Sequence, residues 1–176
     1  MQQGKTVLFT VLDWGLGHAT RSIPIIHAFL RKGFQVSIAG EGNSLLLLKK
    51  EFPELSFYPL EGIQVSYNNS SLNVLLKIPS LLKSIKKEHA QFIELCNHIN
   101  PQMIVSDNRY GAWHPTIPSI FIGHKLYLQA PSVISKFSEP FLFYLHKQFL
   151  KRFNKIWIPD FPGNENLSGV LSHHSS

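Results

Sequence analysis

Short runs of apolar and β-branched residues alternate along the chain with segments whose apolar residues recur every three or four positions. Lys5 to Leu12 (KTVLFTVL) is typical of a buried strand, and the stretch from about His18 to Lys32 has helical spacing. The same two patterns continue through strands at 34–39, 55–58, 103–106, 119–122 and 155–158 and helices at 44–52, 74–99 and 139–153. Strands that alternate with helices predict an α/β fold, in which a parallel sheet carries helices on both faces.

Two segments depart from the regular alternation. Residues 61–73 are expected to form a loop, and Pro79 is expected to interrupt the helix that follows or to begin a new one. The length of 176 residues suits one Rossmann-like domain, which we place at residues 1–160. Residues 161–176 turn to Gly, Asn, Ser and Pro, which predicts a linker or frayed tail leading toward a further domain.

Composition narrows the possible functions. Cys96 is the only cysteine, so no internal disulfide or thiolate metal cluster is possible, and its helical neighbours predict a core position. No segment reaches the roughly 18 apolar residues of a membrane span, and the first residues lack the layout of a signal peptide. We therefore expect a cytosolic protein. The net charge of +6 suits nucleic acid, anionic lipid or phosphorylated small molecules.

Metal and nucleic-acid sites are not predicted. The nine histidines show no HExxH or CxxC-type spacing. Aromatic and basic residues are not interleaved on any one element, so nucleic acid is the least expected partner. Lys77 to Lys87 mixes four lysines with Leu81, Leu82 and Ile85 on one helical face. That face either packs on the sheet with its lysines solvated, or lies against an anionic membrane surface.

The loops after the first and fourth strands are the candidate functional site. Parallel sheets bind ligands at the carboxyl ends of the strands where strand order reverses, and these two strands are usually neighbours there. In the first loop, Gly15 and Gly17 permit a tight turn and the close approach of a ligand. The helix that follows directs free N–H groups at the same crevice, which favours an anion, and Arg21 adds a charged donor.

Titratable side chains follow the same strands. A positive helix end keeps His18 neutral, so it can act as a general base, or it can simply cap the helix. Asp13 is a second base, an orienter of His18, or a cap for the turn.

Other polar residues at this edge are candidate substrate ligands. Asp107 binds substrate or forms an Asx turn, with Asn108 beside it, and Arg109 binds phosphate or faces solvent. His124, after the fifth strand (IFIGH), is expected to line the crevice.

Together these residues resemble a known family. The glycine turn with His18, then Pro24, Ala28 and Gly33, is similar to the amino-terminal half of glycosyltransferase-B fold enzymes. The nearest likeness is to the nucleotide-sugar transferases typified by the lipid II-forming N-acetylglucosaminyltransferase of peptidoglycan synthesis. The stretches PQMIVSDNRYG, IFIGH and IWIPD, which begin at Pro101, Ile120 and Ile156, also resemble segments of these enzymes in the same order.

The resemblance implies a function. Such enzymes have two domains: the front domain binds a sugar or lipid-linked acceptor, often at the inner face of the membrane, and the back domain holds the nucleotide-sugar donor. Transfer is usually metal-independent, and the donor is a co-substrate, so no cofactor is expected. His18 then corresponds to the turn histidine near the acceptor hydroxyl, and Asp13 corresponds less clearly. The chain is expected to be the acceptor-side half of an inverting glycosyltransferase, inactive alone, with possible membrane contact through Lys77 to Lys87.

One departure and two alternatives remain at this point. Where the related enzymes carry Gly-Gly-Thr-Gly-Gly-His, this chain has bulky Trp14 and Leu16, which predict a narrower or differently shaped crevice. One alternative is half of a nonhydrolysing nucleotide-sugar epimerase. The other is a stand-alone nucleotide- or dinucleotide-binding module, because Gly15-Leu16-Gly17 begins a GxGxxG pattern and Glu41 follows the second strand.

Overall fold

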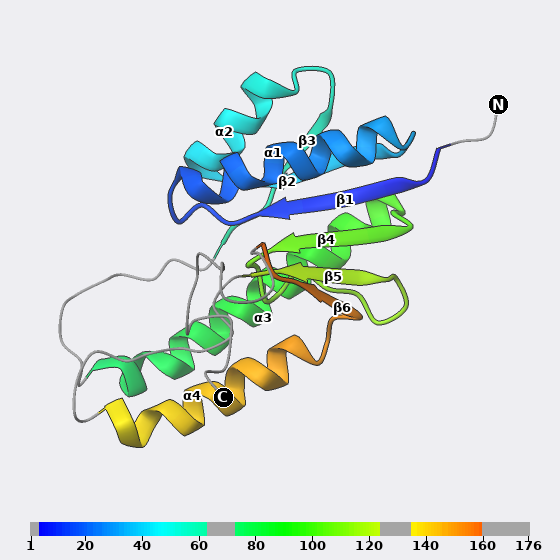
Figure 1. Cartoon of the computed structure of the whole chain (residues 1–176). Coiled ribbons are helices and arrows are strands. Elements are labelled where there is room, and N and C mark those ends of the chain that lie inside the picture. Colours follow the sequence, from blue (N-terminus) through cyan, green and yellow to red (C-terminus); the bar gives the residue numbers. More distant parts are fainter. Residues whose placement is uncertain (1–3, 63–72, 124–134, 160–176) are drawn as a thin grey trace, which may run out of the picture.

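The computed structural model describes residues 4–62, 73–123 and 135–159. Their strands and helices follow one another in the alternation that the sequence predicts (Figure 1). In chain order they are β1 (Thr6–Val11), α1 (Leu16–Arg31), β2 (Gln35–Gly40), α2 (Gly42–Glu51), β3 (Ser56–Pro59), α3 (Asn73–Ile99), β4 (Met103–Asp107), β5 (Ser119–Ile122), α4 (Ser135–Leu150) and β6 (Lys155–Trp157).

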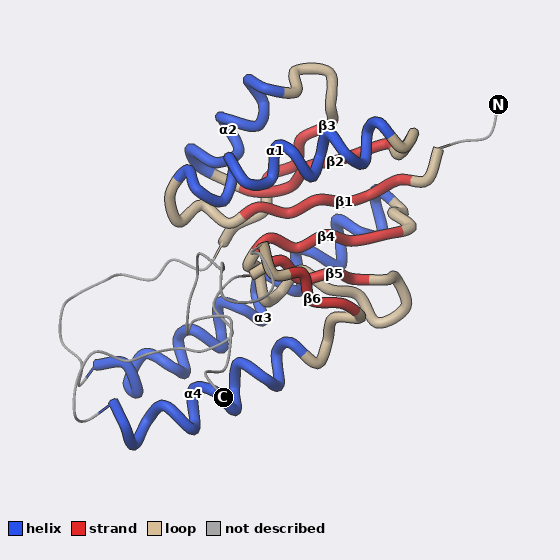
Figure 2. Tube along the Cα trace, viewed as in Figure 1, coloured by secondary structure: helices blue, strands red, loops and turns tan. Residues whose placement is uncertain are grey.

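The strands form one parallel sheet in the order β3-β2-β1-β4-β5-β6. β1 lies between β2 and β4, so strand order reverses beside it, as the sequence predicted. The helices cover both faces of the sheet, with α1 and α2 on one face and α3 and α4 on the other (Figure 2). This arrangement confirms the Rossmann-like α/β fold.

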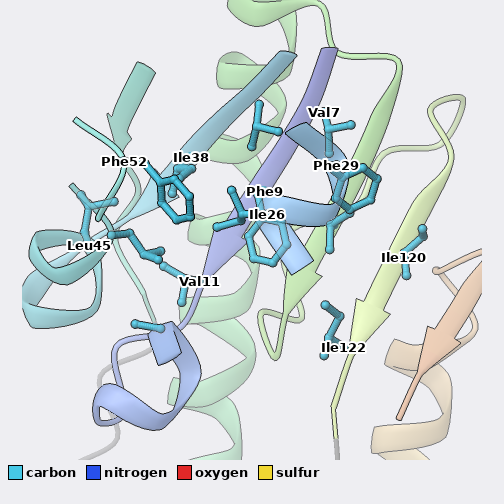
Figure 3. Close-up of a cluster of buried hydrophobic side chains, with 14 residues drawn as sticks. Val7, Phe9, Val11, Ile26, Phe29, Ile38, Leu45, Phe52, Ile120 and Ile122 are labelled. Atoms are coloured by element: carbon cyan, nitrogen blue, oxygen red, sulfur yellow. The ribbon is translucent and has the colours of Figure 1, made fainter. Parts of the chain in front are cut away.

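Apolar side chains fill both faces of the sheet because successive residues of a buried strand point to opposite sides. Val7, Phe9 and Val11 of β1 belong to the cluster under α1 and α2, part of which is shown in Figure 3. Leu8, between them, packs on the opposite face with Phe92 of α3. β1 is therefore at the centre of the domain, and the loop that follows it is held from both sides.

The structure differs from the prediction at several helix boundaries. α1 begins at Leu16, two residues before the predicted start, and α4 begins at Ser135 rather than Glu139. The expected interruption at Pro79 is wrong, because α3 continues through this residue for 27 residues in all. A proline inside a helix removes one backbone donor and crowds the carbonyl four residues before it, and the packed face of a long helix outweighs that cost.

The predicted core position of Cys96 is confirmed. Cys96 is buried in the core, and burial raises the pKa of its thiol to about 12. None of the described helices is both long and apolar enough to cross a membrane. The predicted tail, residues 161–176, and most of the predicted loop at 61–73 lie outside the described residues.

Candidate functional site

The candidate site is at the carboxyl ends of β1 and β4, where the parallel register places Val11 beside Asp107. Along β4 the side chains alternate, so Asp107 is on the same face as Val105, which packs in the cluster under α1. Asp107 is thus the last residue of its strand and points toward the first turns of α1. In α1, His18 and Ser22 are four residues apart and Arg21 lies between them, so all three reach the same place.

These four residues form one hydrogen-bonded network. His18 Nδ1 lies 2.9 Å from Asp107 Oδ1, and Arg21 Nε donates to Asp107 Oδ2 at 2.9 Å. Arg21 Nη2 donates to Oδ1 of the same carboxylate and lies 2.8 Å from His18 Nδ1. Ser22 Oγ lies within hydrogen-bonding distance of both the His18 carbonyl (2.7 Å) and Asp107 Oδ2 (3.0 Å). Both carboxylate oxygens of Asp107 are therefore engaged.

The network keeps a fully buried carboxylate ionised. Asp107 is 0% exposed, and burial by itself would raise the pKa of its carboxyl. The hydrogen bonds from Arg21 and His18, together with the charge of Arg21, outweigh burial and hold the pKa of Asp107 below its ordinary value. Asp107 is consequently ionised at neutral pH. A buried anion beside an imidazole nitrogen can fix the orientation and the tautomer of the ring.

The imidazole of His18 lies between the buried Asp107 and the surface of the domain. Its side chain is 12% exposed, whereas that of Asp107 is fully buried. When Nδ1 carries its proton toward Asp107, Nε2 holds the lone pair. Nε2 is then the ring nitrogen available to a substrate hydroxyl.

The turn before α1 is open and apolar. Gly15 has a φ of +98°, which L side chains rarely adopt, so the turn requires a glycine there. A Cβ at Gly17 would meet nothing within 4 Å, so the space beside it is open. The N-cap residue of α1 is Gly15, which has no side chain to cap the helix. Trp14 and Leu16, which flank Gly15, are 43% and 52% exposed, so the mouth of the site presents apolar surface.

Asp13 belongs to the same loop but faces a different helix. Its carboxylate accepts hydrogen bonds from the backbone N–H groups of Ser44 (2.8 Å) and Asn43 (3.3 Å), in the first turn of α2. Gly42 has a φ of +58°, and a Cβ there would lie 1.8 Å from Asp13 Oδ2. Asp13 therefore caps α2, a helix that sequence reasoning did not connect with it. The alternative of a second base stays a prediction.

Arg109 is also directed away from His18. Its guanidinium is 0% exposed and donates to the Glu88 carboxylate of α3 at 2.7 Å. It also donates to the carbonyl oxygens of Val11 (3.0 Å), Leu60 (3.0 Å) and Glu61 (2.7 Å). These bonds join the ends of β1 and β3 to α3. We therefore leave Arg109 out of the proposed substrate contacts, and its predicted role there stays untested.

Of the other predicted substrate contacts, the structure describes Asn108 but not His124. Asn108 is half-buried and has a φ of +57°, a conformation that asparagine tolerates better than most residues. His124 lies outside the described residues. Within the Lys77 to Lys87 stretch, Ile85 is buried and Lys83 and Lys86 are exposed. Contact of this stretch with a membrane stays a prediction.

A polar cavity of about 250 Å³ lies beside Arg109, on the α3 side of the same sheet edge. Its lining combines donors and acceptors: Glu61, Gly62, Ser84, Lys87, Glu88 and Gln91. Such a mixture suits hydroxyl-bearing ligands.

Sequence reasoning missed Ser22 and Glu88, although each had a detectable signal. Ser22 is four residues after His18, and Glu88 is an acidic residue in an otherwise apolar helical stripe with Ile85 and Phe92.

The sequence matches the model of a known protein family. The family model described as glycosyl transferase family 1 matches residues 5–136. No curated protein matches the chain.

Several solved structures share the fold. MurG of Acinetobacter baumannii aligns with a TM-score of 0.55 and 13% identity, over 92% of this chain and 44% of that one. Arabidopsis thaliana UGT89C1, solved in complex with UDP, aligns with a TM-score of 0.56 and 15% identity, over 90% of this chain and 45% of that one. UGT73P12 of Glycyrrhiza uralensis, complexed with glycyrrhetinic acid 3-O-monoglucuronide, gives a TM-score of 0.53 and 12% identity, over 90% and 44%. The chain thus spans less than half the length of each of these structures.

Proposed function

Because the chain belongs to glycosyl transferase family 1, we propose that it supplies the acceptor side and the catalytic base of an inverting glycosyltransferase. The observation that carries this proposal is the pairing of His18 Nδ1 with the buried carboxylate of Asp107 at 2.9 Å. An imidazole held in this way at the carboxyl edge of a parallel sheet is placed to remove a proton from a bound hydroxyl.

In the proposed reaction, Asp107 holds the proton of His18 on Nδ1, and Nε2 accepts the proton of the acceptor hydroxyl. The acceptor oxygen forms a bond to the anomeric carbon of the donor sugar from the side opposite the leaving group. The bond between that carbon and the nucleotide phosphate breaks, and the nucleoside diphosphate leaves with the bonding electrons. The sugar is therefore transferred with inversion, and the ion pair of His18 with Asp107 stabilises the positive charge that develops on the ring.

The donor we propose is a nucleoside-diphosphate sugar. UGT89C1 was solved with UDP, and the Spinosyn rhamnosyltransferase SpnG, with a TM-score of 0.52 and 13% identity, was solved with thymidine diphosphate. We infer that residues beyond those of this domain contribute most of the donor site, because each relative is more than twice as long as the part aligned here.

For the acceptor, the exposed side chains of Trp14 and Leu16 suggest a molecule with an apolar or flat ring face near its reacting hydroxyl. Hydroxyl groups elsewhere on the same molecule suit the polar cavity beside α3.

The test is a transfer assay on the product of the complete reading frame that contains this chain. Release of UDP or dTDP from UDP-sugars and dTDP-sugars is measured with a panel of phenolic and glycosidic acceptors. His18→Gln is expected to lower kcat by about 10²- to 10⁴-fold, the usual contribution of general-base catalysis. His27→Gln is the matched control, because His27 is on the same helix and pairs with Glu51 at 3.6 Å on the exposed surface. Near wild-type turnover by a folded His18→Gln variant would show that the base is another group.

A further inference from the structure

The polar cavity beside Arg109 is formed by one face of α3 and by Glu61 and Gly62, which follow β3. Four polar side chains of α3 recur at helical spacing and line the cavity from successive turns: Ser84, Lys87, Glu88 and Gln91. Its volume of about 250 Å³ is below the roughly 300–1,000 Å³ of pockets that take a whole drug-sized ligand. The cavity therefore has room for one ring of a larger molecule.

The charged groups of the cavity are already paired. Lys87 Nζ donates to the Glu61 carboxylate at 2.6 Å, and Arg109 Nε donates to the Glu88 carboxylate at 2.7 Å. The hydrogen bond from Lys87, together with its charge, holds the pKa of Glu61 below its ordinary value, so Glu61 is ionised at neutral pH. With two carboxyl groups and one ammonium group in its lining, the cavity disfavours a phosphate or carboxylate ligand. An uncharged ligand that forms hydrogen bonds is favoured instead.

Gln91 leaves one hydrogen-bonding atom of the cavity unused. Its side-chain amide forms a hydrogen bond with Glu61. Because an ionised carboxylate only accepts, this bond comes from Nε2, which fixes the orientation of the amide. The other atom, Oε1, is buried and makes no hydrogen bond within the described part of the chain. A buried amide oxygen without a partner is costly, and a ligand hydroxyl that donates to Oε1 removes that cost.

We propose that this cavity holds the sugar ring of an acceptor that is already glycosylated, and that Gln91 selects acceptors of this class. The inference rests on the proposed function of the chain as the acceptor side of a glycosyltransferase. A sugar ring is uncharged and carries several hydroxyl groups, each of which can donate and accept. One hydroxyl donates to Gln91 Oε1, and another meets the hydroxyl of Ser84, which is two helical turns away on the same face of α3.

The position of the cavity lets one acceptor reach both the cavity and the proposed base. The guanidinium of Arg109 donates to the carbonyl oxygen of Val11, at the end of β1, and to that of Glu61, in the cavity wall. A single guanidinium therefore spans the distance between them. The turn that leads to His18 follows β1 directly. The acceptor has to extend only past the end of β1, with its reacting hydroxyl near His18 and its sugar beside α3.

The first measurement is binding without donor. The ¹⁵N-labelled product of the complete reading frame is titrated with methyl β-D-glucopyranoside, and NMR follows the side-chain amide signal of Gln91, assigned by its loss in Gln91→Leu. We expect this signal to shift and saturate, and sodium phosphate to leave it unmoved. Followed by the backbone signals of α3, binding should be about tenfold weaker in Gln91→Leu and about threefold weaker in Ser84→Ala. Asn97→Leu, the same change on the exposed surface of α3 outside the cavity, is the matched control and should bind as the wild type does.

The second measurement is the transfer assay with a diphenol and its mono-β-glucoside as acceptors. The wild type should show the lower KM for the glucoside, and Gln91→Leu should remove that preference while its KM for the diphenol stays unchanged. A glucopyranoside that leaves the Gln91 signal unmoved, or that binds Gln91→Leu as tightly as the wild type, would overturn the proposal, and so would a shift caused by phosphate. Transfer without glucoside binding refutes this inference alone, whereas glucoside binding without transfer refutes the proposed function and supports the sugar site.

Discussion

Removal of the buried guanidinium of Arg109 should destabilise the domain more than any other single change at this sheet edge. Arg109→Met keeps most of the aliphatic volume but leaves the Glu88 carboxylate, 2% exposed, with the N–H of Gly111 as its remaining described partner. The carbonyl oxygens that Arg109 had bonded also lose their donor. Breaking a buried ion pair from one side costs about 3–5 kcal/mol. With a urea m-value of about 2 kcal/mol/M, the unfolding midpoint should fall by about 1.5–2.5 M.

The loss of stability in Arg109→Met should depend on pH. Burial raises the pKa of the Glu88 carboxyl, even though Arg109 and the Gly111 N–H oppose that effect. A carboxyl with a raised folded pKa contributes stability below its ordinary pKa and loses it as pH rises through the folded value. Without Arg109 the folded pKa of Glu88 should rise further. The destabilisation of Arg109→Met should thus be largest near pH 7 and should shrink toward about pH 4.5, because the Glu88 carboxyl takes up a proton as the pH falls through its raised folded pKa.

The assay is urea unfolding followed by circular dichroism at both pH values. Lys86→Met is the control, since it removes an exposed cation from α3. Glu88→Gln combined with Arg109→Met should recover at least about 1 kcal/mol at neutral pH, because no charge is then left buried. A loss below about 1 kcal/mol for Arg109→Met, or an equal loss at both pH values, would refute the reasoning.

Two further predictions concern the turn before α1. Asp13→Ala should lower the free energy of unfolding by about 1 kcal/mol, because α2 loses its cap, whereas Asp13→Asn should keep most of the wild-type stability. Urea unfolding measures both variants. A large loss of kcat in a stable Asp13→Asn variant would instead favour Asp13 as a base. Trp14→Ala should raise the KM for a ring-bearing acceptor by about tenfold in the transfer assay, with a smaller change in kcat. An unchanged KM would exclude Trp14 from the acceptor site.

Much of the fold follows from the chain's periodicity, and the site follows from it only in part. The short apolar runs of β1, β2, β4 and β5 are typical of buried parallel strands, so their positions and the reversal of strand order beside β1 could be predicted. β3 and β6, at the two edges of the sheet, are more exposed. Sequence reasoning brought His18 and Asp107 to the same edge of the sheet, but it named Asp13 and not Asp107 as a possible orienter of His18, so their pairing is known only from the structure. The family resemblance, which the family match confirms, depended on the same segments.

The hydrogen-bond partners of Asp13 and Arg109 could not be predicted from the sequence in the same way. Asp13 caps a helix 30 residues further along, and Arg109 pairs with an acid 21 residues before it. Both partners are fixed by how α2 and α3 pack on the sheet, and a local pattern carries no information about that packing. A charged residue in a loop at the functional edge of a sheet is therefore ambiguous until its distant partner is known.

At the end of β4, a residue of the candidate site and a residue that stabilises the fold lie almost next to each other in the sequence. Asp107 and Arg109 are separated by Asn108 alone, whose left-handed backbone turns the chain so that the two charged side chains go to opposite faces of the sheet. On one face Asp107 meets α1 and holds His18; on the other, Arg109 binds α3 and the ends of β1 and β3. Because the same Arg109 bonds join the end of β1 to the loop after β4, they help to fix where α1, which follows β1 and carries His18, lies relative to Asp107. The buried Arg109 with its partners and the proposed base His18 thus lie on opposite faces of the same end of β4. The bonds of Arg109 hold that end in place, so the proposed base can be positioned before any substrate binds.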